Sequence, residues 1–364
     1  MSAIRPLLRY QNARSRLRQP RGLASSVEPL RNSPQAPPPG DDHVRIVEVG
    51  PRDGLQNEKK AIPQHTKIEL ISRLARTGLT DIEAGSFVAP RWVPQMAGSD
   101  SILQHILTSP PQSPGPINFS FLAPNARGLK NAQEVLKLHT LDASNRNTIE
   151  ISVFAAASES FSQKNLNCDI ATSLERFKEV IQGAKAHDLR VRGYISVVLG
   201  CPFEGRDISP QRVAEIATNL LEMGVDEISL GDTTGMGTGP STRSLLKAMH
   251  AAGIQNEDIA CHFHDTYGQA LVNTAVSLEH GIRIFDSSVG GLGGCPYSPG
   301  ATGNVATEDM VYFIDSLGMK TGIDLPALAE IGEWISGEID RSNASNVGKA
   351  ILGSRRRRAG ESKL

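Results

Sequence analysis

Short apolar runs rich in β-branched residues alternate with longer amphipathic segments from residue 43 onward. The repeat recurs at intervals of roughly 30 residues, which suits one strand, one helix and their connections. The runs that we predict to be strands are Val44–Val49, Thr80–Ala84, Ile117–Leu122, Ile149–Phe154, Val191–Val198, Glu227–Leu230, Ile259–Phe263 and Ile282–Val289. Strands that alternate with helices in this way predict an α/β protein with a parallel sheet.

The segment 210–223 shows the clearest helical pattern between two of these runs. Val213, Ile216 and Leu220 recur at the spacing of one helix face. Ser209 is suited to the N-cap position, and Gly224 can adopt the left-handed conformation that ends many helices. We therefore expect one helix over this segment.

Eight strand–helix units form either a closed barrel or an open, doubly wound sheet. The number of units favours the barrel, and the first run is not followed by a glycine-rich phosphate-binding turn. We predict a (β/α)8 TIM barrel over residues 43–320 and a C-terminal helical extension over residues 321–354. A barrel of this kind needs about 250 residues, for which the chain of 364 residues has room.

The first 42 residues differ in composition from the predicted barrel. Six arginines and no acidic residue precede Glu28, a composition typical of a mitochondrial transit peptide. A disordered basic segment without an address is the alternative. Residues 33–42 contain several prolines, which exclude a helix and indicate a linker. We interpret residues 1–42 as a transit peptide and a Pro-rich linker.

The sequence ends in Ser362-Lys363-Leu364, the tripeptide that the peroxisomal import receptor reads. Four arginines, Arg355–Arg358, stand just before it. We interpret residues 355–364 as an exposed basic tail that carries this signal, with a nuclear address as a weaker alternative. The two ends together predict delivery to the mitochondrial matrix and also to peroxisomes.

The remaining composition argues against several classes of partner. A net charge of −1 gives no reason to expect nucleic acid or an anionic membrane. No apolar run approaches the roughly 18 residues that a membrane-spanning helix needs. The four cysteines form no CxxC pair, so we expect no zinc site built from thiolates.

His262 and His264 stand at the carboxyl end of the seventh run, where TIM barrels carry their chemistry. Residues i and i+2 of a strand point to the same side. A lone histidine would more often be a hydrogen-bonded core residue, but two on one side can share a metal ion. Asp53 and Asn304 could complete a set of nitrogen and oxygen ligands, which suits Mg²⁺ or Mn²⁺ at least as well as zinc.

Further ionisable residues stand at other strand ends. Arg52 could form a surface ion pair with Asp53, but its place after a strand favours the barrel mouth. Glu83 lies near the end of the second run and Asp232 follows the sixth, where they could equally cap the helices that follow.

The glycine-rich stretch 290–303 is expected to be too flexible for a core element. We interpret it as a loop that closes over a ligand. Cys295 lies within this stretch, where a thiol can exchange a proton with a bound intermediate.

Five segments resemble those of the 3-hydroxy-3-methylglutaryl-CoA lyase family, and the resemblance extends over residues 44–340. The segments are Glu48–Asn57 (EVGPRDGLQN), Ile82–Val88 (IEAGSFV), Gly231–Gly237 (GDTTGMG), His262–Ala270 (HFHDTYGQA) and Gly290–Tyr297 (GGLGGCPY). The histidine motif and the Arg-Asp pair are similar to those of related synthase barrels. The cysteine in the last segment is the feature by which the lyases differ from the synthases.

The resemblance implies cleavage of 3-hydroxy-3-methylglutaryl-CoA to acetyl-CoA and acetoacetate, a reaction of leucine degradation and ketone-body formation. It implies Mg²⁺ or Mn²⁺ bound by Asp53, His262, His264 and Asn304, substrate contacts from Arg52 and Gln56, and catalytic roles for Cys295, Arg52, Glu83 and Asp232. The base that accepts the substrate's hydroxyl proton stays open between Asp53 and His262. We also expect an acyl-CoA substrate and a homodimer.

Three alternatives remain at this point. A related lyase could act on a longer branched 3-hydroxyglutaryl-CoA, because the residues that line the substrate pocket cannot be read from the sequence. A Claisen-type acyl synthase could use the same fold, although Cys295 argues against it. A non-catalytic metal-binding scaffold is the third alternative, against which the many polar residues at the strand ends argue.

Deletion of Ser362-Lys363-Leu364 tests the expected C-terminal address. Antibody imaging of the untagged chain should show that the peroxisomal pool disappears and the mitochondrial pool remains, because the receptor reads the free C-terminal tripeptide. The control replaces Arg357 with Gln and keeps the tripeptide, so its distribution should match the unaltered chain. An unchanged distribution after the deletion would refute this address.

Overall fold

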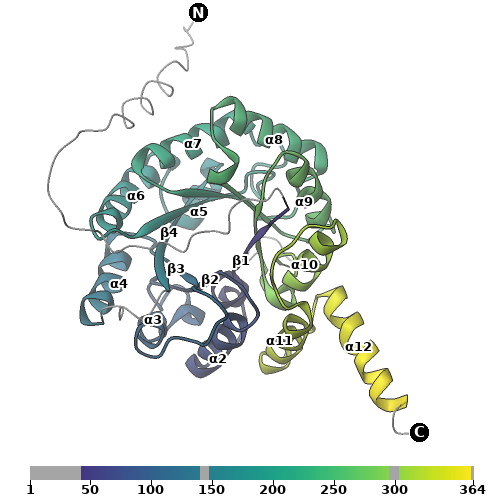
Figure 1. The fold of residues 1–364 in the computed structure, drawn as a ribbon. Helices are drawn as coiled ribbons and strands as arrows, with labels where there is room; N and C mark the ends of the chain where they lie inside the picture. The colour runs from purple at the N-terminus through teal and green to yellow at the C-terminus, as the bar shows by residue number, and fades with distance from the viewer. Residues whose placement is uncertain (1–41, 140–146, 295–302, 362–364) are drawn as a thin grey trace, which may run out of the picture.

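The computed structural model describes residues 42–139, 147–294 and 303–361, and within them eight parallel strands close into a barrel (Figure 1). Each strand pairs with the next one along the chain, and β8 pairs with β1 to close the ring. The strands are β1 (Arg45–Glu48), β2 (Asp81–Ser86), β3 (Asn118–Leu122), β4 (Thr148–Ala156), β5 (Arg190–Ser196), β6 (Glu227–Asp232), β7 (Ile259–Phe263) and β8 (Ile284–Ser287). The predicted TIM barrel is confirmed, and every predicted run overlaps one of these strands.

Helices surround the barrel, and at least one follows each strand (Figure 1). They are α2 (Gln64–Ala75), α3 (Ser99–Thr108), α4 (Ala126–Leu138), α5 (Glu159–Leu166), α6 (Ile170–Lys185), α7 (Pro210–Met223), α8 (Gly239–Ala251), α9 (Ala270–Glu279), α10 (Thr307–Ser316), α11 (Leu325–Glu338) and α12 (Asn346–Glu361). The sequence analysis did not predict α5. Helices α11 and α12 are the expected C-terminal helices.

Helix α7 has the ends that its sequence predicts. The side chain of Ser209 accepts a hydrogen bond from the backbone N–H of Arg212. Gly224 ends the helix with φ of 109°, in the left-handed region where a Cβ would be strained. Val213 and Leu220 are fully buried against the barrel wall.

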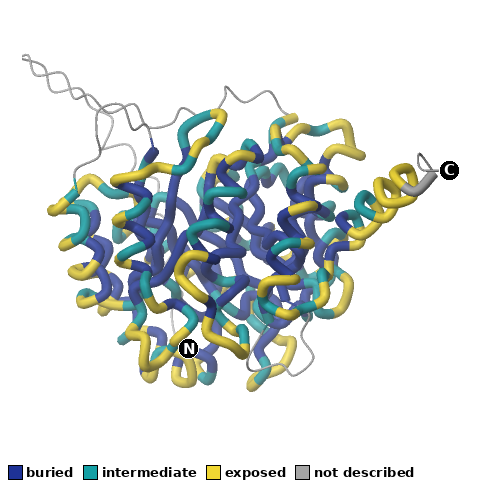
Figure 2. The backbone as a smooth tube through the Cα atoms, turned by 90° about the horizontal axis from the view of Figure 1, so that it is seen from below, coloured by how far each residue is buried: buried dark blue, intermediate teal, exposed yellow. Residues whose placement is uncertain are grey.

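The apolar core lies between the strands and the helices, and the tube in Figure 2 is buried at its centre and exposed on the outer helices and loops. Alternate residues of one strand point to opposite faces. On β5, Val191 and Ile195 belong to this core, whereas Arg192 and Tyr194 share the other face, where Arg192 donates to the hydroxyl of Tyr194 and to Asp286 of β8. The barrel interior is therefore partly polar, which is unusual because TIM barrels commonly fill it with branched apolar residues.

The first part of the glycine-rich stretch is ordered, contrary to our prediction. Val289–Gly291 forms a short 3-10 helix, η4, and residues 289–293 are buried. Gly290, Gly291 and Gly293 have φ of 65°, 64° and 123°, so glycine is needed for this turn rather than for flexibility. Residues 295–302, with Cys295, lie outside the described residues.

Two fully buried carboxyl groups accept hydrogen bonds from the backbone of η4. Glu48 accepts hydrogen bonds from the backbone N–H groups of Gly50 (2.8 Å) and Val289 (2.9 Å). Glu308 accepts from the N–H of Gly290 with both carboxyl oxygens, at 3.1 and 2.9 Å. Burial raises the pKa of Glu48 to about 7 and that of Glu308 to about 8, because burial disfavours a charged carboxylate.

The segment 355–361, which we expected to be part of a basic tail, is the last part of helix α12. Two of its arginines form ion pairs with α11, Arg355 with Glu330 and Arg356 with Glu333. Arginine is also a good helix former, so the helix continues through the run. Among the residues that the structure describes, no helix is long and apolar enough to cross a membrane.

Candidate active site

Arg52 and Asp53 lie on one turn of π-helix, η1 (Gly50–Gly54), which follows β1. Such turns are rare and occur frequently at functional sites. A Cβ on Gly54 would lie 2.6 Å from Oγ of Ser288, so the turn packs tightly against the segment after β8. This packing fixes both side chains at the carboxyl-end mouth of the barrel.

The two histidines come from the end of β7, and both are buried. Their ring centroids are 5.3 Å apart. His264 forms an isolated antiparallel bridge with Asn304, and the N–H of Asp265 donates to the carbonyl of Gly303 at 2.9 Å. The chain that leaves β8 therefore returns to β7 and brings Asn304 beside the histidines.

The four residues that we predicted to bind metal lie together. Asp53, His262 and His264 offer ligand atoms that lie within 4.8 Å of one another. Asn304 donates from Nδ2 to Oδ2 of Asp53 at 2.8 Å. The buried Nδ1 of His264 has no hydrogen-bond partner among the described residues, which suits an atom meant for a ligand. This set of nitrogen and oxygen donors fits a divalent cation.

The protonation states of Asp53 and His264 also suit metal binding. Burial alone would raise the pKa of Asp53, but Arg52 and the two histidines lower it to about 2. Burial, helped by the neighbouring His262, lowers the pKa of His264 to about 4. Near neutral pH, Asp53 is therefore an anion and His264 is neutral, which are the forms that bind metal ions.

Asp286 of β8 lies behind His262 and was not singled out by the sequence analysis. Its Oδ2 is 3.1 Å from Nδ1 of His262. Burial would raise the pKa of Asp286, but Arg192 and His262 hold it well below its ordinary value. Burial lowers the pKa of His262, but the carboxylates of Asp286 and Asp53 raise it above its ordinary value. An ionised carboxylate only accepts hydrogen bonds, so Nδ1 of His262 carries a proton, and a cation would bind at Nε2 in place of a second proton. That Nε2 lies 3.9 Å from Oδ2 of Asp53, on the metal side.

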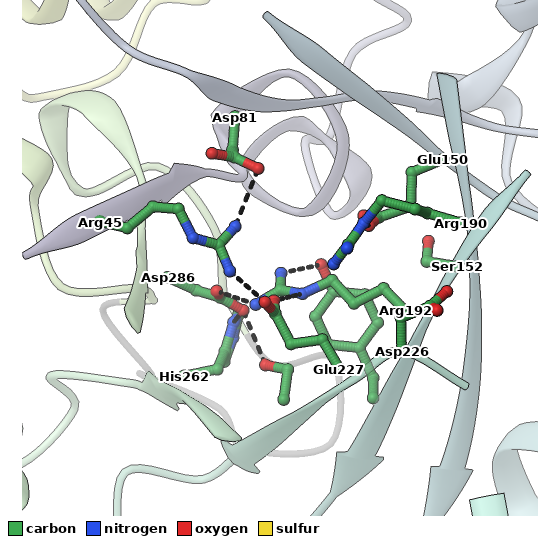
Figure 3. A network of polar contacts seen from close by, with 12 residues as sticks. Arg45, Asp81, Glu150, Ser152, Arg190, Arg192, Asp226, Glu227, His262 and Asp286 are labelled. Carbon is green, nitrogen blue, oxygen red and sulfur yellow. Dashed lines mark hydrogen bonds and ion pairs between the residues drawn. The ribbon is translucent and has the colours of Figure 1, made fainter. Parts of the chain in front are cut away.

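A network of buried charges inside the barrel holds Asp286 (Figure 3). Arg192 donates to Oδ1 of Asp286 at 2.7 Å and to Oε1 of Glu227 at 2.9 Å. Arg45 pairs with Glu227 and, at 2.9 Å, with Asp81. The charges alternate in sign, so each one lies beside an opposite charge despite burial. Charged residues within otherwise apolar strands, such as Arg192 and Asp286, were the sequence signal that could have revealed this network.

Arg52 is fixed on three sides. Its guanidinium group lies 2.8 Å from Oδ1 of Asp53 and 2.6 Å from Oε2 of Glu83. Its Cζ lies 5.3 Å from the centroid of the Tyr194 ring, a cation–π contact. Burial raises the pKa of Glu83 although Arg52 lowers it. Glu83 is fully buried behind Arg52 and holds it, instead of capping a helix.

The other predicted site residues lie in different places. Gln56 lines the cavity described below, near Arg52. Asp232 is fully buried and accepts a hydrogen bond from the N–H of Gly237 at 2.9 Å, so it shapes the turn after β6. Burial raises the pKa of Asp232 to about 7. Cys295 is outside the part of the chain that the structure describes.

A cavity of about 1370 Å³ opens at this rim. It begins at Arg52, Asp53 and the two histidines and extends outward over α4, α5 and α6. Its lining there includes Arg127, Lys164 and Arg176. The volume exceeds that of common small-molecule pockets, about 300–1,000 Å³, so the cavity can take a long ligand.

Fold and site define a TIM-barrel protein with a candidate metal centre at the carboxyl ends of its strands. The pattern of the HMGL-like family matches residues 43–335. The chain belongs to this family, as its motifs predicted.

Relatives and a solved structure agree with this assignment. The 3-hydroxy-3-isohexenylglutaryl-CoA/hydroxy-methylglutaryl-CoA lyase of Pseudomonas aeruginosa is 52% identical over 309 residues, 85% of this chain and 97% of that protein. The mitochondrial hydroxymethylglutaryl-CoA lyase of Rattus norvegicus is 48% identical over 308 residues, 84% of this chain and 89% of that protein. The crystal structure of hydroxymethylglutaryl-CoA lyase from Pseudomonas aeruginosa aligns with a TM-score of 0.78 at 50% identity, covering 86% of this chain and 98% of that one.

Asp286→Asn tests how His262 is positioned. An asparagine amide can donate to Nδ1 of His262 and so favour the tautomer whose Nε2 carries the proton and cannot bind metal. We expect Mn²⁺ affinity to fall by roughly 10–100-fold, measured by calorimetric titration of the metal-free protein. The control Asp81→Asn changes the far end of the same network (Figure 3) and should keep the affinity. Equal affinity in Asp286→Asn would contradict this role.

Proposed function

We propose that this chain cleaves 3-hydroxy-3-methylglutaryl-CoA to acetyl-CoA and acetoacetate. The observation that supports the proposal best is the meeting of Asp53, His262 and His264 beside a fixed Arg52, at the inner end of a long cavity. The family and the lyase names of its relatives agree with this chemistry. In metabolism, the reaction would serve leucine degradation and ketone-body formation.

The reaction is a retro-Claisen cleavage. The C3 hydroxyl loses its proton, the C2–C3 bond breaks to give acetoacetate and the enolate of acetyl-CoA, and that enolate takes up a proton at carbon. Asp53, His262, His264 and Asn304 would hold a divalent cation, Mg²⁺ or Mn²⁺. When bound, the cation supplies a Lewis acid that lowers the pKa of the C3 hydroxyl. Of the two candidates to accept the hydroxyl proton, Asp53 and His262, the geometry favours Asp53. A carboxylate has a second oxygen when one binds the cation, whereas His262 has no free lone pair when Nδ1 is protonated and Nε2 binds the cation.

Arg52 would stabilise the enolate. Negative charge develops on the thioester oxygen as the C2–C3 bond breaks, and a fixed cation there stabilises the transition state more than the ground state. Glu83 and Tyr194 hold the guanidinium group in place before substrate arrives, so little reorganisation is needed. Gln56 lines the same part of the cavity and would contact the substrate.

The outer part of the cavity suits coenzyme A. Arg127, Lys164 and Arg176 line it, and cationic side chains bind phosphate groups well. A thioester placed at Arg52 would have its nucleotide portion directed toward these cations. An acyl-CoA substrate is therefore consistent with both ends of the cavity.

A lyase for a longer branched 3-hydroxyglutaryl-CoA is the second candidate. The name of the Pseudomonas aeruginosa relative, which includes an isohexenyl substrate, favours it. The residues at the rim would perform the same cleavage in both cases. The two substrates differ only in the group on C3, so the ratio of kcat/KM for the two thioesters distinguishes the candidates.

We also propose a cellular compartment and an oligomeric state for this chain. The basic, acid-free N-terminal segment favours mitochondrial delivery, and a relative is named as mitochondrial, whereas another comes from a bacterium. The peroxisomal address relies on the C-terminal tripeptide alone. The expected homodimer can be checked by light scattering of the purified chain.

Removal of the metal tests the proposed activity. Purified protein should release acetoacetate from 3-hydroxy-3-methylglutaryl-CoA, lose this activity after treatment with a chelator, and regain it when Mg²⁺ or Mn²⁺ is added, because the cation activates the C3 hydroxyl. Protein treated with a chelator already saturated with Mg²⁺ is the control and should stay active. Full activity in metal-free protein would refute metal dependence, and no cleavage of either thioester would refute the lyase.

Cys295, for which the resemblance implies a catalytic role, is the proposed proton donor to the enolate carbon, and Cys295→Ser tests this role. A serine hydroxyl is a far weaker acid than a thiol, so proton delivery to the enolate carbon should slow while metal binding persists. We expect kcat to fall by about 100-fold or more. Cys168→Ser is the control and should keep kcat, because Cys168 is a buried cysteine that lies between α5 and α6 and is not one of the proposed metal ligands. Near-normal kcat in Cys295→Ser would remove Cys295 from the chemistry.

A further inference from the structure

The backbone turn after β8 fixes the side chain of Asn304. We call residues 289–294 the β8 turn. The carbonyl of Leu292 in this turn accepts a hydrogen bond from Nδ2 of Asn304 at 3.1 Å. A Cβ on Gly293 would lie only 2.6 Å from the same Nδ2. A shift of the turn would therefore move or release one of the four proposed metal ligands.

Arg341 holds the carbonyl side of this turn. Its guanidinium group donates to the carbonyl of Gly293 at 3.0 Å and to that of Gly291 at 3.3 Å. Arg341 follows α11 and lies in the C-terminal extension, beyond residue 335, where the family pattern ends. The backbone N–H of Ala344 adds a hydrogen bond to the carbonyl of Gly290 at 2.9 Å.

The same guanidinium group reaches the segment after β1. It pairs with Oε1 of Glu58 at 2.7 Å, and the two side chains are only 24% and 15% exposed. Glu58 stands shortly after η1, the turn that carries Asp53. Arg341 therefore joins the segment that carries Asp53 to the turn that fixes Asn304.

Side chains form hydrogen bonds to the β8 turn on two sides. Glu48 and Glu308 accept from the N–H groups of Val289 and Gly290 on one side. Arg341 donates to carbonyl groups on the other side. The guanidinium group of Arg341 is charged, and its hydrogen bonds are stronger than those between neutral groups, so they help to hold the turn in one position.

We infer that Arg341 is a positioning residue of the metal site, which means that the C-terminal extension completes the site. The inference rests on the proposed function, because it assumes that Asp53 and Asn304 bind the cation. Arg341 itself would touch neither cation nor substrate. It acts by holding the two segments in register, so its loss should weaken cation binding more than it weakens the fold.

The experiment is a calorimetric titration of the metal-free, full-length protein with Mn²⁺, together with thermal unfolding of the same metal-free samples. Arg341→Met removes the charge and all three contacts and keeps most of the side-chain volume. Arg341→Lys keeps a charge for Glu58 but has no planar fork for the two carbonyl groups. The matched control is Lys60→Met, because Lys60 forms an ion pair with Asp340 (3.4 Å) between the same two segments but both partners are well exposed.

We expect Mn²⁺ affinity to fall roughly 10–100-fold in Arg341→Met, in the range found for residues that orient metal ligands. Arg341→Lys should recover part of this loss, and Lys60→Met should bind as the unaltered chain does. If Arg341→Met does not fold, the lysine variant alone carries the comparison.

Unchanged affinity with a lowered unfolding temperature would overturn the inference, because it would make Arg341 a purely structural residue. The same loss of affinity in Lys60→Met would also overturn it. If the unaltered chain binds no Mn²⁺, the proposed metal site fails first. The titration therefore separates failure of the proposed function from failure of this inference.

Discussion

The guanidinium group of Arg192 lies inside the barrel with 1% of its side chain exposed, and the geometry of the metal site depends on how its charge is neutralised. A buried cation is costly unless anions and hydrogen bonds surround it. Asp286 and Glu227 provide both, on strands that are not neighbours of each other. Asp286 in turn accepts from Nδ1 of His262, which leaves Nε2 facing the proposed metal site. The need to neutralise Arg192 inside the barrel thus fixes the position of Asp286, and through it the protonation of His262 at the barrel mouth.

Glu48 and Glu308 are buried carboxyl groups that, unlike Asp286, have no arginine beside them in the described part of the chain. Glu48 and Glu308 are as buried as Asp286, but backbone N–H groups and a threonine hydroxyl hold them instead of an arginine. Their pKa values are raised, whereas that of Asp286 is lowered. The first pair shapes the backbone of the β8 turn, and Asp286 keeps a proton on Nδ1 of His262, a proposed metal ligand. The same residue type at the same depth performs different tasks because its partners differ.

The strands, and the placement of His262 and His264 on one side of β7, could be predicted from the sequence because both follow local rules. Apolar runs with a period of two give strands, and His262 and His264 share a side of one strand. Asp286 and Arg192 could not be assigned their roles in this way, since their contact joins β5 and β8 across the barrel. Arg341 was missed for a similar reason, because its partners lie far from it in the chain. The glycine-rich stretch was partly misjudged: glycines at positive φ permit a tight, buried turn as readily as a flexible loop.

The central claim is that Asp53, His262, His264 and Asn304 hold one divalent cation at the barrel mouth. Crystals of the full-length protein soaked in Mn²⁺ and measured at the manganese absorption edge test it most directly. The account predicts one anomalous peak at the barrel mouth, with a carboxylate oxygen of Asp53, a nitrogen of each histidine and the amide oxygen of Asn304 at about 2.0–2.4 Å. A peak elsewhere on the molecule, or one bound by only one of these residues, would contradict it.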